Sequence, residues 1–228
     1  MVHHRVNMQE NFTIIIEPEK PANASVIWLH GLAADANDFL PVVDQFIFPD
    51  NLNIRFIFPN APVRPITLNG GISMQGWYDI IGIGPDYEED KEGIEASQQI
   101  VEDLIEKECE KGIATDRIIL VGFSQGGAVA LHTGIRYTQQ LAAVLALSTY
   151  LPLRQNIEQE ICNLQKTTPI VFMHGSKDLV VPIGFAQHSY DRLNEFELNV
   201  KWFEYDMQHT VCLEQINDIN KLIVDLLI

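Results

Sequence analysis

The sequence predicts a single α/β domain in which a mostly parallel sheet carries helices on both faces. Short apolar runs alternate with longer helical patterns, and these runs are continuous, as in strands that are buried on both faces. One of the predicted strands also leads through a Gly-x-Ser-x-Gly turn directly into a helix. The length of 228 residues suits one such domain, and we find no internal repeat or linker. We therefore expect residues 1–228 to form one domain.

The predicted elements follow from the spacing of the apolar residues. Apolar runs predict strands at residues 12–16, 25–29, 53–58, 117–121, 141–147, 169–173 and 200–205. Helical spacing predicts helices at residues 94–111, 126–136, 185–196 and 213–227. Residues 59–90 stand apart, because they combine many prolines and glycines with apolar residues of no clear period. Two interpretations of this loop remain open, the wall of a pocket and a plug of the core.

The composition excludes several classes of function. A formal net charge of −16 argues against binding to nucleic acid and against steady binding to anionic membranes. No apolar run approaches the roughly 20 residues of a membrane span, and neither a secretory signal nor a lipidation motif is found. The three cysteines, Cys109, Cys162 and Cys212, have no metal or disulfide spacing. We expect a cytoplasmic protein without a stable membrane anchor of its own.

The motif Gly122-Phe123-Ser124-Gln125-Gly126 has the layout of a nucleophile elbow. In such a turn the serine lies in a strained backbone conformation, and the glycines leave room for chain segments that pass close by. The hydroxyl is then placed at a helix N-terminus, where free N–H groups favour developing negative charge. The motif therefore predicts a nucleophile at Ser124. The alternative is a tight turn with a purely structural role.

A serine nucleophile needs a base that takes its proton and a third group that orients the base. In hydrolases with this turn the acid follows the serine and the histidine comes last. The histidines after Ser124 are His132, His174, His188 and His209. The first and third fall within predicted helices, and His174 fits better as a neighbour of the acid. His209 is the predicted base, because it lies in a loop between a strand and the last helix.

The predicted acid is Asp178, which comes just after the carboxyl end of the strand at residues 169–173. Asp206 is closer to the histidine in sequence, but its position suggests a surface residue at the end of a strand. Asp191 and Asp218 lie on predicted helices. Asp178 therefore completes the predicted triad.

An oxyanion needs two hydrogen-bond donors, each worth about 3 kcal/mol of transition-state stabilisation. The backbone N–H of Gln125, the residue after the nucleophile, is one predicted donor. The N–H of Leu32 is the other, because Leu32 lies in the turn after the strand that ends at Leu29, and Gly31 gives this turn its freedom. Taken alone, His30-Gly31 is more typical of an ordinary strand-end turn.

With these residues placed, the chain resembles the acyl-protein thioesterase family, also called the phospholipase/carboxylesterase family. The resemblance extends from Val26 to about Leu227. The segments that carry it are Trp28-Leu29-His30-Gly31-Leu32, Pro59-Asn60-Ala61-Pro62-Val63-Arg64-Pro65, Trp77-Tyr78-Asp79-Ile80, Arg117 to Gly127, and His174-Gly175-Ser176-Lys177-Asp178 with Val181-Pro182. After His-Gly-Leu the family usually has a glycine and a second glycine nearby, whereas this chain has Ala33, Ala34 and Asp35. It also has Thr210 where serine is usual.

The resemblance implies an α/β-hydrolase fold without a large cap domain, and the same triad and oxyanion donors. It also implies an acyl-binding groove along the loop from Ile66 to Trp77. We expect Ile72, Met74, Trp77 and Val181 to contact the acyl chain. Members of the family cleave carboxylic esters and thioesters, including S-acylated proteins and lysophospholipids, without a metal or cofactor. Many of them form homodimers.

The predicted function is therefore that of a serine esterase or thioesterase. A lysophospholipase-like lipid hydrolase is the nearest alternative. A peptidase or a dienelactone-type hydrolase would use the same triad, although the family segments disfavour both. A non-catalytic binding protein on a hydrolase fold is a further alternative, but such proteins commonly lose a triad residue.

Overall fold

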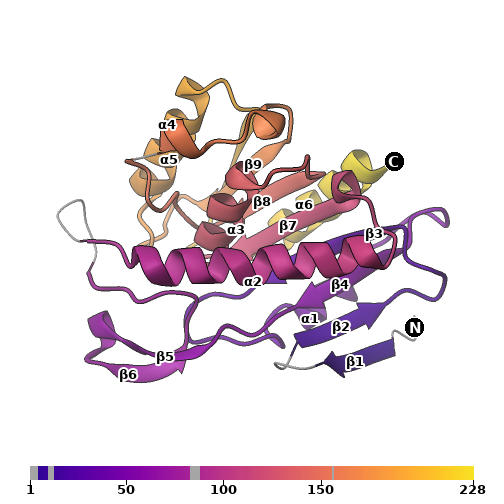
Figure 1. Ribbon diagram of the computed structural model, residues 1–228, viewed down its shortest axis with the longest axis horizontal. Helices are drawn as coiled ribbons and strands as arrows, with labels where there is room; N and C mark the ends of the chain where they lie inside the picture. The colour runs from indigo at the N-terminus through magenta and orange to yellow at the C-terminus, as the bar shows by residue number, and fades with distance from the viewer. Residues whose placement is uncertain (1–4, 10–12, 83–87, 156) are drawn as a thin grey trace.

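The structure, a computed structural model, describes residues 5–9, 13–82, 88–155 and 157–228 (Figure 1). Eight strands form the main sheet in the order β1-β2-β4-β3-β7-β8-β9-β10. Their bounds are β1 Arg5–Gln9, β2 Thr13–Glu17, β3 Ala24–Leu29, β4 Ile54–Phe58, β7 Ile118–Phe123, β8 Ala143–Leu147, β9 Ile170–Gly175 and β10 Val200–Tyr205. Strands β1 and β2 pair antiparallel, as do β2 and β4, and every other pairing in this sheet is parallel.

The strand register brings the carboxyl ends of the parallel strands to one edge of the sheet. Leu29 of β3 pairs with Gly122 of β7, and Tyr205 of β10 pairs with Gly175 of β9. The segments that follow β3, β7, β8, β9 and β10 therefore all begin at this edge. Ligands of open α/β sheets bind at such an edge.

Helices cover both faces of the sheet (Figure 1). Buried residues of α2, α3 and α5 form one apolar core with the sheet, and those of α1 and α6 form the other. The α-helices are α1 Leu40–Val43, α2 Lys91–Glu110, α3 Gln125–Arg136, α4 Ile157–Glu160, α5 Ile183–Glu195 and α6 Leu213–Leu227, and the short 3-10 helices are η1 Thr67–Asn69, η2 Thr115–Arg117 and η3 Asn163–Lys166. Within the described ranges, no helix is sufficiently long and apolar to cross a membrane.

Every strand and helix that the sequence predicts is present, with ends that differ by a few residues. Residue 12 of the first predicted strand lies outside the described residues, as do residues 83–87 of the loop predicted at 59–90. Strand β1 was not predicted, because a short edge strand pairs on one side only and carries little apolar signal.

The segment at residues 59–90 is not wholly irregular, contrary to expectation. Strands β5 Val63–Ile66 and β6 Ile72–Gln75 form an antiparallel hairpin, which lies at the lower left in Figure 1. Gly70 and Gly71 make its turn possible, since their φ angles of 67° and 79° favour glycine. The hairpin was missed because its exposed strands lack an apolar run. Ile66 and Trp77 are fully buried, so part of the segment does plug the core.

Candidate active site

Ser124 lies in a strained turn between β7 and α3. Its φ of 53° and ψ of −120° fall outside the regions that most residues favour. A Cβ atom at Gly122 would come closer than 3.0 Å to the backbone of Gly126, and one at Gly126 would collide with the carbonyl oxygen of His30. The two glycines of the motif are therefore needed for close backbone approach, as the sequence predicted.

Three side chains predicted to act together are joined by hydrogen bonds at the carboxyl edge of the sheet. His209 Nε2 lies 3.0 Å from Ser124 Oγ, and His209 Nδ1 lies 2.7 Å from Asp178 Oδ2. Ser124 follows β7, Asp178 follows β9, and His209 lies between β10 and α6. The serine, histidine and carboxylate therefore have the contacts that general-base activation of a hydroxyl requires.

Both oxygen atoms of the Asp178 carboxylate form hydrogen bonds. Its Oδ1 accepts hydrogen bonds of 2.9 Å from the backbone N–H groups of Val180 and Val181. Its Oδ2 is left to face His209, and the residue is only 4% exposed. A buried carboxylate fixed in this way keeps the Nδ1 proton on His209, so that Nε2 is free to accept the serine proton.

The other candidate residues occupy different positions. His132 is buried within α3, where burial lowers its pKa to about 3. His174 donates from Nε2 to the carbonyl oxygen of Val181 at 2.8 Å, so it supports the segment that carries Asp178, as predicted. Asp206 forms an exposed ion pair with Lys177. Among the hydrogen bonds of the described residues, none joins one of these groups to Ser124.

The two predicted oxyanion donors lie on the segments that follow β3 and β7. Gln125 is the first residue of α3, and Leu32 lies in the turn after β3. Within the described residues, neither amide donates to a protein acceptor. The side chain of Gln125 is fixed as well, since it accepts from the N–H of Trp77 at 2.9 Å and donates to the carbonyl oxygen of Tyr78 at 2.7 Å.

A cavity of about 480 Å³ opens at this edge of the sheet. Ser124, His209, Leu32 and Gln125 all line it. The remaining wall comes from irregular segments and the start of α5, and its apolar members include Leu68, Ile80, Ile81, Phe123, Leu151, Val180, Val181 and Phe185. The cavity is thus large and apolar enough for an acyl chain whose carbonyl carbon reaches the serine.

The prediction of the acyl-binding residues needs correction, because only Val181 of the four lies in this wall. Trp77 is fully buried and donates from Nε1 to the carbonyl oxygen of His30 at 2.8 Å. Ile72 is 63% exposed on β6, and Met74 of the same strand accepts a hydrogen bond from the side chain of Asn69. None of the residues of β6, all of which the structure describes, is among those that line the cavity.

Several wall residues were not predicted. The hydroxyl groups of Tyr78 and Tyr150 lie 3.0 Å apart, although the residues are far apart in the sequence. Burial raises the pKa of both tyrosines, which keeps the pair neutral at physiological pH. Glu89 also lines the cavity, and burial raises its pKa. Tyr78 lies in a family segment, but no local signal in the sequence brings Tyr150 beside it.

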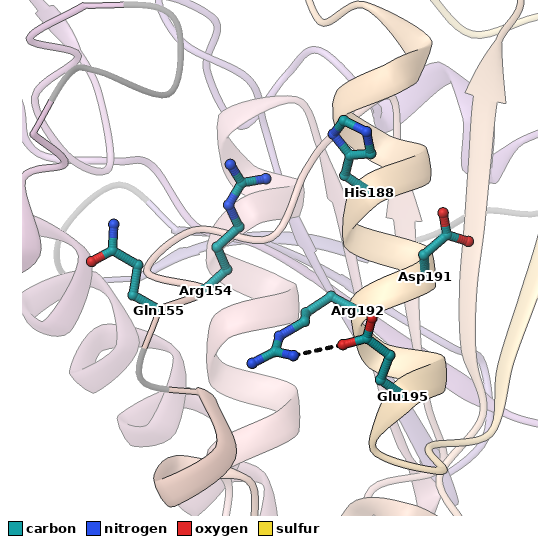
Figure 2. Close-up of a pocket in the computed structure, with 6 residues that line it drawn as sticks. All are labelled: Arg154, Gln155, His188, Asp191, Arg192 and Glu195. Atoms are coloured by element: carbon teal, nitrogen blue, oxygen red, sulfur yellow. Dashed lines mark hydrogen bonds and ion pairs between the residues drawn. The ribbon is translucent and has the colours of Figure 1, made fainter.

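A second hollow of about 500 Å³ lies between α5 and the segment that carries Arg154 and Gln155 (Figure 2). It is lined by Arg154, Gln155, His188, Asp191, Arg192 and Glu195, and Arg192 pairs with Glu195 at 2.6 Å. Arg154 and Gln155 line both cavities. Among the described residues that line it there is no serine, cysteine or threonine, so the cavity at Ser124 is the better candidate for an active site.

The sheet topology, the strained serine turn and the hydrogen-bonded residues at the carboxyl edge define the class of α/β-hydrolases. The chain belongs to the phospholipase/carboxylesterase family, which it matches over residues 10–227. It is accordingly a serine hydrolase of carboxylic esters or thioesters.

Individual relatives agree with this assignment. The chain is 39% identical to acyl-protein thioesterase 1 of Neurospora crassa over 211 residues, which cover 89% of this chain and 86% of the relative. It is 32% identical to acyl-protein thioesterase 1 of Cryptococcus neoformans, with coverage of 93% and 96%. Crystal structures of Arabidopsis thaliana SOBER1 and Zea mays acyl-protein thioesterase 2 superpose with TM-scores of 0.86 and 0.85, both at 26% identity. They cover 91% and 94% of this chain, and 100% and 98% of their own.

Proposed function

We propose that Ser124, His209 and Asp178 are the catalytic triad of this hydrolase, with the backbone amides of Leu32 and Gln125 as oxyanion donors. The observation that carries the proposal is the chain of hydrogen bonds from the carboxylate through the imidazole to the hydroxyl. Ser124 at one end of this chain lines the apolar cavity.

In the first half-reaction, Ser124 Oγ attacks the acyl carbonyl carbon while His209 Nε2 takes the hydroxyl proton. Asp178 orients the ring and stabilises the imidazolium. The oxyanion of the tetrahedral intermediate accepts hydrogen bonds from the amides of Leu32 and Gln125. The intermediate then collapses to an acyl-enzyme, and the alcohol or thiol leaves with the proton from His209. Where the thiol leaves as a thiolate, His209 gives its proton to solvent before the second half-reaction.

In the second half-reaction, water takes the place of the alcohol or thiol. His209 removes a proton from the water, which attacks the carbonyl carbon of the acyl-enzyme. The same two amides stabilise the second oxyanion. Collapse releases the carboxylic acid and returns the proton to Ser124.

We further propose S-acylated proteins as the substrate class. Two relatives carry the name acyl-protein thioesterase, and the cavity wall here is rich in apolar side chains. A thioester carbonyl at Ser124 would place the acyl chain against this wall and leave the peptide at the cavity mouth.

The experiment is a comparison of substrates with a common control. Hydrolysis is measured for p-nitrophenyl esters of two to sixteen carbons, an S-palmitoylated peptide and a lysophospholipid, each with the wild type and with Ser124→Ala. We expect cleavage of the long-chain thioester, reduced at least about 10⁴-fold by the substitution while the fold is unchanged. Activity confined to short esters or to the lysophospholipid would contradict the substrate class, and full activity of Ser124→Ala would contradict the triad.

The predicted cytoplasmic location and homodimer remain predictions from the sequence and its resemblance. Sedimentation velocity of the purified protein at several concentrations tests the second.

A further inference from the structure

His30 is a buried residue next to the oxyanion site, and it has no part in the reaction steps described above. The residue is only 2% exposed and lies directly after β3. Its Nδ1 atom lies 2.7 Å from the carbonyl oxygen of Gly31, and its Nε2 atom accepts a 3.0 Å hydrogen bond from the N–H of Ala61. Its ring also packs against Trp77, with ring centroids 5.3 Å apart.

These two contacts determine the tautomer of His30. A backbone N–H can only donate, so Nε2 must be the unprotonated nitrogen that accepts from Ala61. The ring proton is therefore on Nδ1 and is donated to the carbonyl oxygen of Gly31. Burial lowers the pKa of His30, which agrees with a neutral ring.

The carbonyl oxygen of Gly31 and the N–H of Leu32 belong to the same peptide unit. This unit is planar, and in the trans form its C=O and N–H point in opposite directions. A donor that holds the oxygen therefore fixes the direction of the N–H. It also polarises the unit, which makes the N–H a stronger donor.

We propose that His30 is a positioning residue, which aims the N–H of Leu32 at the oxyanion by holding the other end of its peptide unit. This inference rests on the proposed role of Leu32 as an oxyanion donor. The N–H of Ala34 also donates to the Gly31 oxygen, at 3.3 Å, so that oxygen is held by two groups.

The turn is held on its other side by the hairpin. The N–H of Ala33 donates to the carbonyl oxygen of Gln75 at 2.9 Å, and Ala33 has a φ of 62°, which is unfavourable for alanine. Such strain persists only where surrounding contacts maintain it. The unit that joins Gly31 to Leu32 is therefore fixed between His30 and β6.

The matched substitutions His30→Asn and His30→Gln separate positioning from packing. The amide nitrogen of asparagine can take the place of Nδ1 and donate to Gly31, but asparagine does not reach Ala61. The amide oxygen of glutamine can take the place of Nε2 and accept from Ala61, but glutamine leaves the Gly31 oxygen without its side-chain donor. Each variant therefore keeps one contact of the ring and loses the other.

The readouts are kcat and KM for one p-nitrophenyl ester, together with the thermal midpoint of each variant. We expect His30→Gln to lower kcat by about 10- to 100-fold with little change in KM, because a misdirected donor stabilises the transition state less. His30→Asn should remain within about 5-fold of the wild type. Wild-type kcat in His30→Gln, or equal losses in both variants, would overturn the proposal.

Two further results complete the test. If His30→Gln does not fold, His30→Asn decides alone, since a large loss of kcat in this folded variant would contradict the role of the Nδ1 proton. Ser124→Ala is measured in parallel. Its inactivity beside an unaffected His30→Gln would reject the positioning role alone, whereas activity of Ser124→Ala would reject the proposed function itself.

Discussion

The proposed triad and the cavity wall meet at Ser124, but they are built differently. Each residue of the proposed triad lies within a few residues of a strand end, and two backbone N–H groups hold the carboxylate of Asp178. The wall consists of side chains on irregular segments, and some are partly open to solvent, such as Ile81 at 41% exposure. We therefore expect substitutions in the wall to change the preference for the acyl chain, with less effect on the reaction itself than substitutions in the proposed triad.

The largest effect is expected at the buried carboxylate. With Asp178→Asn, the side-chain oxygen would still accept from Val180 and Val181, and the amide nitrogen would then face His209. Because a donor cannot accept the Nδ1 proton, the ring would take the tautomer that cannot act as the base. We expect kcat to fall by about 10⁴-fold.

The matched control is Asp206→Asn, since this exposed carboxylate pairs only with Lys177 among the contacts of the described residues. Its kcat should stay within about twofold of the wild type, because exposed ion pairs contribute little. Steady-state kinetics measures kcat for both variants. Similar losses of kcat in Asp178→Asn and Asp206→Asn would contradict a special role for Asp178.

A second prediction concerns the backbone of the serine turn. With Gly126→Ala, the new Cβ would collide with the carbonyl oxygens of His30 and Leu29, which cannot move without distorting β3. We expect the free energy of unfolding to fall by about 2–4 kcal/mol. Gly184→Ala on α5 is the control, because its Cβ would meet no atom within 4 Å. Urea denaturation of both variants checks the prediction, and equal stabilities would contradict it.

A third prediction concerns the pH dependence of stability and His132, which lies on α3, the helix that follows the serine turn. Burial, and then the charge of Arg136, lower the pKa of His132 from 6.5 to about 3. Between these two values the unfolded chain binds a proton that the folded protein does not. The contribution of His132 is therefore fully present above about pH 6.5, and it is lost as the pH falls toward 3.

His132→Leu removes this contribution. Between pH 7 and pH 5, the wild type should lose about 2 kcal/mol more free energy of unfolding than the variant does. His30 and His174, whose pKa values are also lowered by burial, remain in both proteins and cancel in the comparison. Urea denaturation at the two pH values measures the difference, and parallel pH profiles would show that His132 does not contribute.

The smallest effect is expected at the wall. Ile81→Asp places a charge in the lining of the cavity, and we expect kcat/KM for a long-chain ester to fall about 10-fold. A two-carbon ester should be cleaved as before, since its acyl group does not reach that far. Ile72→Asp is the control, because this isoleucine is exposed on the hairpin outside the cavity. A larger loss of kcat/KM in Ile72→Asp than in Ile81→Asp would contradict this expectation and would support the sequence-based prediction that Ile72 contacts the acyl chain.

The same difference explains which features could be predicted from the sequence. The position of Asp178 follows from the strand before it, and that of His209 from the loop between a strand and a helix, so both are local signals. The partnership of Tyr78 and Tyr150, by contrast, depends on tertiary packing that no spacing encodes. Trp77 was predicted in the wall as an apolar loop residue, but only the fold shows that it is buried beneath His30.

Covalent labelling tests the central claim most directly. The protein is treated with a serine-directed fluorophosphonate, digested, and mapped by mass spectrometry, with Asp178→Asn labelled in parallel. We expect a single modified residue, Ser124, which is labelled much more slowly in the variant because His209 no longer activates the hydroxyl. Modification of another residue, or equal labelling rates in the two proteins, would contradict it.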